Sequence, residues 1–266
     1  MKKLKKGEYF GTNFQKLTFE NIIITDTEYT HQKVDWHYHE NPYFTYLLQG
    51  KLFESNKKES YYLEPGNLLF HNWQDAHYNI KPPEFTRGFH IELNENWFSN
   101  YDINITDFEG SINIKNPFTK NLMNKVYVES KNNDQYSNLG IESLLIQLFS
   151  SLKENQKICF KKPEWVNKLQ ELLLEENMDY SLNSLGSALG IHPIHLSREF
   201  NRYFGTSLGH YIRVLKVNKA FHLIASNKYS MTDICYQCGF YDQSHFISNF
   251  KKIYDTSPTK LFRKIY

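Results

Sequence analysis

Histidines in the N-terminal half of the chain have a spacing that could hold a metal ion. His37 and His39 lie two residues apart in the run DWHYHENPYFTYLLQGK, and His71 and His77 follow a later Pro-Gly turn. Residues i and i+2 of a β-strand point to the same face of a sheet, so His37 and His39 could share one ion through their imidazole nitrogens. The same histidines could instead line a ligand pocket or pack in a core.

The segments that must position these histidines have the pattern of β-strands. Between residues 20 and 98, short runs rich in Ile, Tyr, Phe and Leu are separated by polar turns such as NKKE and EPGN. Several short strands at this spacing predict a barrel or a sandwich. The basic start MKKLKKGEYF is followed by no apolar stretch, so we expect a solvated, frayed end and no signal peptide.

The run HYHENPYFTYLLQG resembles the first cupin motif, His-x-His-x3-Glu-x6-Gly, with Tyr43 at the position of the Glu. The second cupin motif supplies another histidine after a Pro-Gly turn, and His77 suits this role better than His71 because it would close the next strand. In enzymatic cupins, three His and one Glu hold a metal. Because this carboxylate is missing, we expect no metal and no cofactor. A pocket in the barrel would be lined by His37, His39, Tyr43 and His77.

The hydrophobic period changes to that of a helix after residue 117. One helical face carries an apolar stripe made by Ile141, Leu144, Leu145, Leu148 and Leu152. This stripe could pack on the barrel or on a second copy of the chain. A polar linker is expected over 153–162, and helices follow from Pro163 onward.

These patterns predict α and β structure in separate domains. We expect a cupin-like β-barrel domain over residues 1–115, a helical dimerisation or linker region over 116–160, and an all-α domain with two helix-turn-helix motifs over 161–266. The charge is divided in a similar way. Residues 180–266 carry 11 Lys+Arg against 4 Asp+Glu, a net charge of +7, whereas residues 1–179 carry 20 against 25, a net charge of −5. The basic C-terminal part therefore suggests a polyanion partner.

The C-terminal part contains an internal sequence repeat. The segment LSREFNRYFGTSLGHYIR at 196–213 is matched 50 residues later by FISNFKKIYDTSPTKLFR. In each copy a glycine, Gly190 or Gly239, supplies a turn between two short helices, which is the outline of a helix-turn-helix. A helix over 207–226 joins the copies, and at 1.5 Å per residue it spans about 30 Å, close to one DNA turn of about 34 Å. Two recognition helices on this strut could therefore enter successive major grooves.

Cysteine usage and hydropathy bear on the location of the protein. The cysteines are an odd and sparse set, Cys159, Cys235 and Cys238, which favours a reducing cytoplasm. No apolar run approaches the ~20 residues that span a bilayer, so no membrane partner is expected. Cys235 and Cys238 form a lone Cys-x-x-Cys without the second pair of a zinc site, and we expect them to pack in a core.

Residues 161–266 resemble the AraC/XylS family of bacterial transcription regulators. The family signature reads Gly-Phe, then Phe-x3-Phe-Lys, then Thr/Ser-Pro and an aromatic residue followed by Arg. Here these positions hold Gly239-Phe240, Phe246, Phe250-Lys251, Ser257-Pro258 and Phe262-Arg263. Asp255 stands where the family usually has Gly. Because Asp tolerates a left-handed backbone better than most residues, we expect this turn to survive.

The resemblance implies which residues touch DNA. Base-reading positions would be Ile194, Ser197 and Arg198 on the first recognition helix and Gln243, Ser244 and Ser248 on the second. Arg can read guanine and Gln can read adenine, whereas Ile194 could only contact a thymine methyl or a sugar, or be a partly exposed core residue. His195, His245 and Asn249 are expected to face outward beside them. The phosphate candidates are Arg202, Lys251 and Lys252.

The resemblance also implies that the barrel over 1–115 is a sensor domain, with an effector pocket made of His37, His39, Tyr43 and His77. We therefore predict a cytoplasmic, sequence-specific DNA-binding transcription regulator, an effector-responsive activator that is not an enzyme and has no catalytic residues. The expected partners are double-stranded DNA, a small-molecule effector, a second copy of the chain in a homodimer, and RNA polymerase. The alternative is a metal-dependent cupin enzyme with an accessory helical domain.

Overall fold

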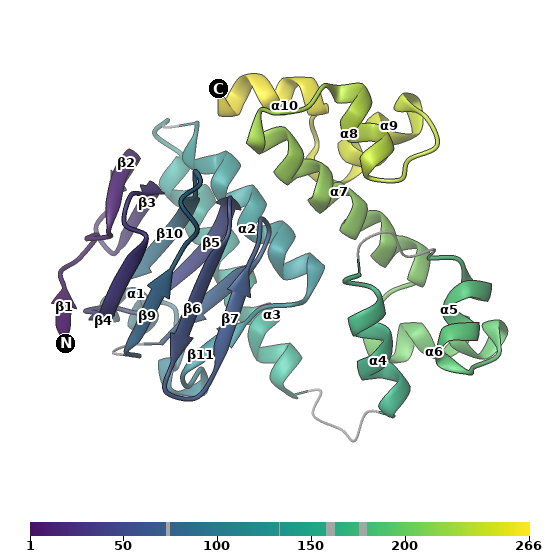
Figure 1. Ribbon diagram of the computed structural model, residues 1–266, viewed down its shortest axis with the longest axis horizontal. Helices are drawn as coiled ribbons and strands as arrows, with labels where there is room; N and C mark the ends of the chain where they lie inside the picture. Colours follow the sequence, from purple (N-terminus) through teal and green to yellow (C-terminus); the bar gives the residue numbers. More distant parts are fainter. Residues whose placement is uncertain (73–74, 133, 158–162, 176–179) are drawn as a thin grey trace.

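The chain folds into a β-rich N-terminal part and a helical C-terminal part, which lie at opposite sides of Figure 1. The computed structural model describes residues 1–72, 75–132, 134–157, 163–175 and 180–266. The separate β-rich and helical regions confirm the predicted fold class. Within the described residues, no helix has the length and apolarity needed to cross a membrane.

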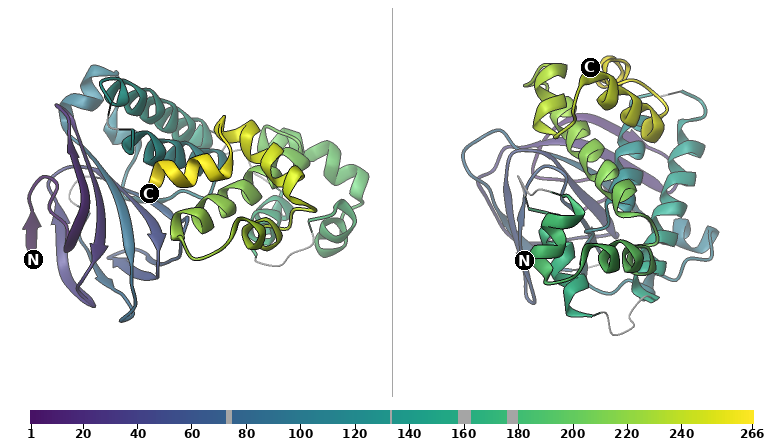
Figure 2. Two further views of the ribbon diagram at one scale, coloured as in Figure 1. Left: turned by 90° about the horizontal axis from the view of Figure 1, so that it is seen from above. Right: turned by 90° about the vertical axis from the view of Figure 1, so that its right-hand side faces the viewer.

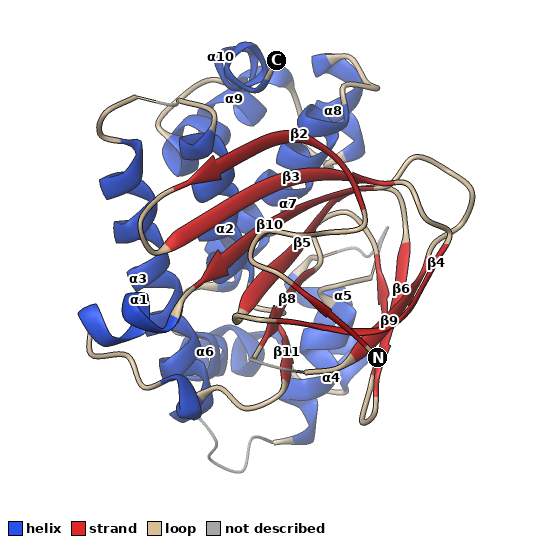
Figure 3. Cartoon of the chain, turned by 90° about the vertical axis from the view of Figure 1, so that its left-hand side faces the viewer, coloured by secondary structure: helices blue, strands red, loops and turns tan. Residues whose placement is uncertain are grey.

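Two sheets face each other in the N-terminal part, and Figure 3 shows helices behind the longer strands. The five-stranded sheet has the order β1-β4-β9-β6-β7, and the six-stranded sheet has the order β11-β8-β5-β10-β3-β2. The strands are β1 (Lys2–Leu4), β2 (Gly11–Thr18), β3 (Ile22–Tyr29), β4 (Lys33–His39), β5 (Tyr43–Gln49), β6 (Leu52–Asn56), β7 (Ser60–Leu63), β8 (Leu68–His71), β9 (His77–Ile80), β10 (Arg87–Leu93) and β11 (Ser111–Asn113).

The predicted frayed N-terminus is wrong. β1 pairs in parallel with β4, with Lys2 opposite His37 and Leu4 opposite His39. The Leu4 side chain is only 1% exposed. The sequence does not reveal this strand, because a single apolar residue among lysines shows no alternation of apolar and polar residues. The strand forms because the edge of β4 offers unpaired backbone groups.

Three α-helices and a 3-10 turn follow β10, with β11 between η1 and α2: α1 (Glu95–Asn100), η1 (Ile105–Asp107), α2 (Pro117–Ser130) and α3 (Ser137–Lys157). The apolar stripe of α3 lies in the main core, where Phe149 packs on Phe44 and Phe70 of the six-stranded sheet. The stripe therefore covers the barrel, and it is not the surface that would meet a second copy. α3 continues to Lys157, so the expected linker cannot begin at 153. Residues 158–162 lie outside the described residues.

The C-terminal part is helical, as predicted. Its helices are α4 (Glu164–Leu172), α5 (Leu182–Leu189), α6 (Pro193–Phe204), α7 (Leu208–Ser226), α8 (Met231–Gln237), α9 (Gln243–Tyr254) and α10 (Pro258–Ile265). Pro163 is the N-cap of α4. Cys235 and Cys238 are buried free thiols, which confirms the expectation of core packing, and Cys159 lies outside the described residues.

The two helix-turn-helix motifs have different cores. The first motif, α5 and α6, packs with α4 around Leu169, Leu196 and Phe200 in a cluster of its own. The second motif, α8 and α9, places Phe246 and Phe250 in the same buried cluster as the barrel. α7 reaches both cores, and α10 lies beside α2 (Figure 2). The second motif is therefore built against the barrel, whereas the first motif stands apart from it.

Candidate functional site

The first motif is shaped by local capping residues. α5 ends at Gly190, whose φ of +66° suits a residue without a Cβ atom. α6 begins at the N-cap His192, whose Nδ1 accepts a hydrogen bond from the Ile194 backbone N–H, and Pro193 occupies the first turn. These residues place the N-terminal half of α6 at the surface, as a recognition helix requires.

The predicted contact residues of α6 are exposed. Ile194 is 65% exposed and is not a core residue, which leaves the DNA-facing interpretation of its position. His195, Ser197, Arg198 and Arg202 are exposed on the same helix, and the Arg202 guanidinium lies 3.5 Å from the carboxylate of Glu199. A surface pair of this kind contributes little stability, so Arg202 remains available to a phosphate.

The second motif has the same construction with different caps. Ser230 and Asp233 form a capping box at the start of α8, and Asp242 caps α9 by accepting from the His245 backbone N–H at 2.7 Å. α9 ends at Asp255 with a φ of +55°, so the residue that replaces the usual Gly does adopt the left-handed conformation. The predicted second recognition helix is therefore present.

The exposed face of α9 carries Gln243, Ser244, His245, Ser248, Lys251 and Lys252. The Gln243 amide is oriented by a hydrogen bond of 2.8 Å to the Thr232 hydroxyl on α8. The expectation for Asn249 is wrong, because its side chain is buried and donates back to the His245 carbonyl at 2.7 Å. This intrahelical bond satisfies the amide group inside the helix, where the sequence alone suggested a surface position.

A groove runs between α7 and α9, with a volume of about 430 Å³. Its lining includes His210 and Arg213 from α7 and His245, Ser248 and Lys252 from α9. The sequence pattern identified the α9 residues of this groove but not His210 and Arg213. The signal for Arg213 was its match to Arg263 across the repeat, which places a basic residue beside each motif. The groove adds cationic groups next to the second recognition helix.

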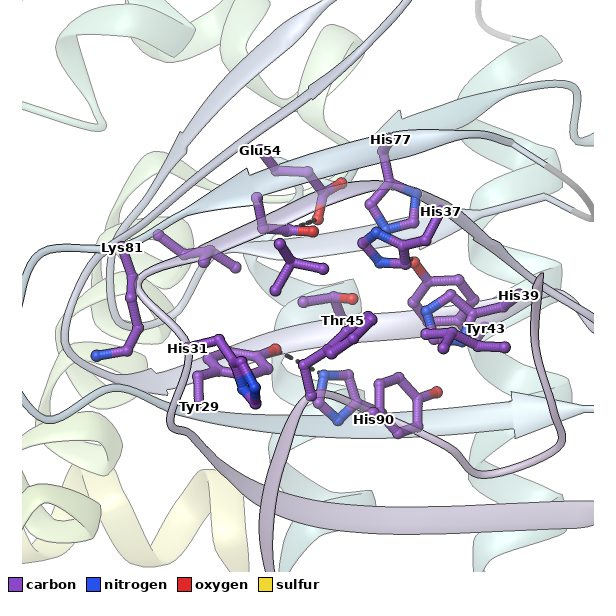
Figure 4. Close-up of a pocket in the computed structure, with 16 residues that line it drawn as sticks. Tyr29, His31, His37, His39, Tyr43, Thr45, Glu54, His77, Lys81 and His90 are labelled. Atoms are coloured by element: carbon purple, nitrogen blue, oxygen red, sulfur yellow. Dashed lines mark hydrogen bonds between the residues drawn. The ribbon is translucent and has the colours of Figure 1, made fainter. Parts of the chain in front are cut away.

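The predicted effector residues converge on a small cavity between the two sheets. Figure 4 shows His37 beside His77, with His39 close to Tyr43. The cavity volume is about 40 Å³. The lining also includes residues that the sequence did not single out, namely Tyr9, Phe10, Tyr29, Thr45, Glu54 and His90. Tyr9 stacks on His90 with ring centroids 3.8 Å apart, so the N-terminal segment forms one wall of the cavity.

Three of these histidines form a possible metal site. Ligand nitrogens of His37, His39 and His77 all lie within 4.8 Å of one another, and the three side chains are buried. Burial and the nearby His77 lower the pKa of His37 to about 4. Burial likewise lowers the pKa of His39 and of His77 below the usual 6.5. The three rings are therefore neutral near pH 7 and can offer lone pairs.

The cavity lining also includes a buried carboxyl group that the sequence pattern missed. Glu54 on β6 accepts a hydrogen bond of 2.9 Å from the Asn79 amide, and its Oε1 lies 3.3 Å from His71 Nε2. Burial raises the pKa of Glu54 to about 8, so this group is protonated at neutral pH. In the sequence, Glu54 could have been noticed as a charged residue within the short run KLFES, at a position whose side chain points into the barrel.

The fold joins a double helix-turn-helix region to a β-barrel with a histidine-lined cavity. Residues 185–264 match a family model described as a helix-turn-helix domain. The HTH-type transcriptional activator RhaS of Escherichia coli strain SMS-3-5 is 26% identical over 144 residues, which are 52% of this chain and 51% of that protein. The matched residues lie in the part of the chain whose sequence resembles the AraC/XylS family.

Solved structures are also similar to this chain. ToxT from Vibrio cholerae is 14% identical in one of its crystal forms, covers 92% of this chain and 99% of its own, and has a TM-score of 0.39. The C-terminal domain of the response regulator yesN from Fusobacterium nucleatum is 26% identical over 38% of this chain and 99% of its own, with a TM-score of 0.35. The chain therefore spans about half the length of RhaS.

Proposed function

We propose that the chain is a sequence-specific DNA-binding transcription regulator whose helices α6 and α9 enter successive major grooves. One observation carries this proposal: two exposed recognition helices both pack on α7 (Figure 1), α6 through Phe200 on Tyr211 and α9 through Tyr254 on Phe221. At 1.5 Å per residue α7 spans about 28 Å, near the ~34 Å repeat of a DNA duplex. Two motifs on one strut can therefore read two segments on the same face of the duplex.

The exposed side chains divide into two roles. Arg198 and Gln243 are the proposed base readers, since each can make two hydrogen bonds to one base edge. Smaller residues beside them, Ile194, Ser197, Ser244 and Ser248, would add contacts to methyl groups and base edges. The proposed phosphate contacts are His195, Arg202, His210, Arg213, His245, Lys251 and Lys252.

The barrel is proposed to sense an effector and to act on the DNA-binding part. The division into a sensor over 1–115, a helical region over 116–160 and a DNA-binding domain over 161–266 remains our proposal. A homodimer, contact with RNA polymerase, a cytoplasmic location and the lack of enzymatic activity are parts of it. Activation, rather than repression, is suggested by the similarity to RhaS, which is a transcriptional activator.

A metal-dependent enzyme is the second candidate, because the histidine triad could hold a catalytic ion. The test that separates the two starts with selection of a preferred duplex from a random pool by the full chain, followed by footprinting. We expect two protected segments about one helical turn apart. Recovery of no preferred sequence at any salt concentration would contradict the regulator.

A further inference from the structure

We propose that the barrel cavity binds one divalent transition-metal ion through His37, His39 and His77, and that this ion is the effector of the regulator. The metal site is independent of the DNA-binding role. The effector role of the ion rests on the proposed function.

The size of the cavity favours an ion over an organic effector. Its volume of about 40 Å³ is far below the roughly 300–1,000 Å³ of pockets for small organic molecules. A water molecule needs roughly 10–15 Å³ on this measure, so the cavity has room for only a few waters. A metal ion that keeps one or two water ligands fits this space, whereas a sugar or a fatty acid does not.

The histidines are oriented as metal ligands usually are. His37 Nδ1 bonds to the Asp35 carbonyl at 2.9 Å, and His77 Nδ1 bonds to the Asp75 carbonyl at 3.0 Å. A backbone carbonyl accepts an N–H, so in both rings Nε2 keeps the lone pair, which is the common second-shell arrangement. Among the described residues, His39 Nδ1 is buried and has no hydrogen-bond partner. A metal would use a polar atom that the fold otherwise leaves unsatisfied.

The donor set points to a particular class of ion. Three imidazoles suit zinc, copper, nickel or iron, and they do not suit magnesium or calcium, which prefer oxygen ligands. Zn–N bonds are ~2.0–2.1 Å, so two ligand nitrogens can be at most about 4.2 Å apart. The nitrogens of the triad lie within 4.8 Å, so modest rotations of the rings would bring them into coordination. Tyr43 occupies the position where cupins carry a Glu, and it leaves the fourth ligand position to water.

Strand β5 connects this site to the second helix-turn-helix motif. Tyr43 Oη lies 3.1 Å from His77 Nε2, the nitrogen that an ion would take, so metal binding must displace Tyr43 from it. Three residues further along, on the opposite face of β5, Tyr46 Oη lies 2.8 Å from His222 Nε2 on α7. One strand thus touches the metal site on one face and the strut of the DNA-binding part on the other.

The first experiment measures metal binding by the full chain. The metal-stripped protein is titrated with Co²⁺ and Zn²⁺, and the readouts are the Co²⁺ absorption spectrum, the bound metal after gel filtration and the melting temperature. We expect one ion per chain and a melting temperature that rises with metal. His39→Gln and His77→Gln should each lose at least 100-fold in affinity and the melting shift. His31→Gln, an exposed residue at the cavity, should retain both.

The second experiment measures DNA binding by fluorescence anisotropy, with the duplex selected by the full chain, with and without Zn²⁺. We expect the metal to change the affinity at least fivefold in the wild type and in His31→Gln, and to have no effect in His77→Gln. Tyr46→Phe should bind metal normally but lose most of the response of DNA affinity. If a triad variant does not fold without metal, the Tyr46→Phe comparison still tests the coupling.

The outcomes separate the two proposals. Specific DNA binding without stoichiometric metal overturns the metal site and leaves the regulator intact. Stoichiometric metal with an unchanged DNA affinity overturns the effector role. Metal binding with turnover of a small substrate and no preferred duplex overturns the regulator and favours the enzyme.

Discussion

Tyr46 of the barrel and His222 of the DNA-binding part share a buried hydrogen bond of 2.8 Å between Tyr46 Oη and His222 Nε2. The single hydroxyl proton of Tyr46 is donated to Asn124 Oδ1 on α2, so the His222 ring must donate its Nε2–H. Burial lowers the pKa of His222 to about 3, which keeps the ring neutral. The Asn124 amide in turn donates to Tyr254 Oη, at the end of α9, at 2.7 Å. A polar chain therefore connects the barrel to the second recognition helix.

Removal of the Tyr46 hydroxyl should destabilise the whole chain. Tyr46→Phe leaves the His222 and Asn124 groups buried without this partner, which costs about 1–3 kcal/mol. Urea unfolding monitored by circular dichroism measures the loss. Tyr62→Phe is the matched control, because that side chain is 82% exposed and should change the free energy of unfolding very little. Equal stability of the two variants would show that water replaces the missing bond.

Arg198 is expected to read a base. Arg198→Ala should weaken binding to the selected duplex by about 1–3 kcal/mol and relax the preference at one base pair. The reason is the exposed position of Arg198 on the N-terminal half of α6. Arg202→Ala is the matched control, and it should weaken specific and random DNA alike. An equal loss on both DNAs for Arg198→Ala would reduce it to a phosphate contact.

Gln243 is expected to act about one helical turn away from the Arg198 position. Gln243→Ala should change the base preference in the other protected segment of the footprint, because α6 and α9 belong to separate motifs that pack on different residues of α7. Thr232→Val removes only the hydroxyl that orients the Gln243 amide, so it should produce a smaller effect at the same base pairs. Overlap of the Arg198 and Gln243 effects on the same few base pairs would refute the two-groove arrangement.

Glu54 should make stability depend on pH. Burial raises its pKa from the usual 4.5 to about 8, so the folded chain keeps a proton that the unfolded chain releases above pH 4.5. Its stabilising contribution is complete below pH 4.5, decreases as the pH rises, and is lost above about pH 8. Glu54→Gln, which resembles the protonated acid, should lack this part of the decrease.

The measurement is the melting temperature of the wild type and of Glu54→Gln between pH 4 and 9. The difference between the two curves isolates Glu54 from the histidines that titrate in the same range. Glu64→Gln serves as the control because Glu64 is exposed, and it should follow the wild type. Parallel curves for the wild type and Glu54→Gln would mean that Glu54 is ionised in the folded chain.

The β-barrel illustrates where prediction from the sequence stops. The strands around β5 could be predicted from their apolar runs. The pairing of His37 with His39 followed from strand alternation, and the addition of His77 followed from the resemblance to the cupin motifs. The strand that contains Leu4 could not be predicted, because it depends on the free edge of β4. The stripe on α3 was recognisable, but its partner was not, since an apolar helical face fits a sheet as well as a second chain.

The sequence by itself determined the double helix-turn-helix, because its signals are local. Glycine at a left-handed turn, a capping box and an apolar period act within a few residues, so each can be recognised without knowledge of the rest of the chain. Only the tertiary structure decided the size of the histidine-lined cavity, the burial of Glu54 and the contact between Tyr46 and His222. These features join side chains far apart in the sequence, and they depend on how the sheets and helices fill space together, which no local pattern specifies.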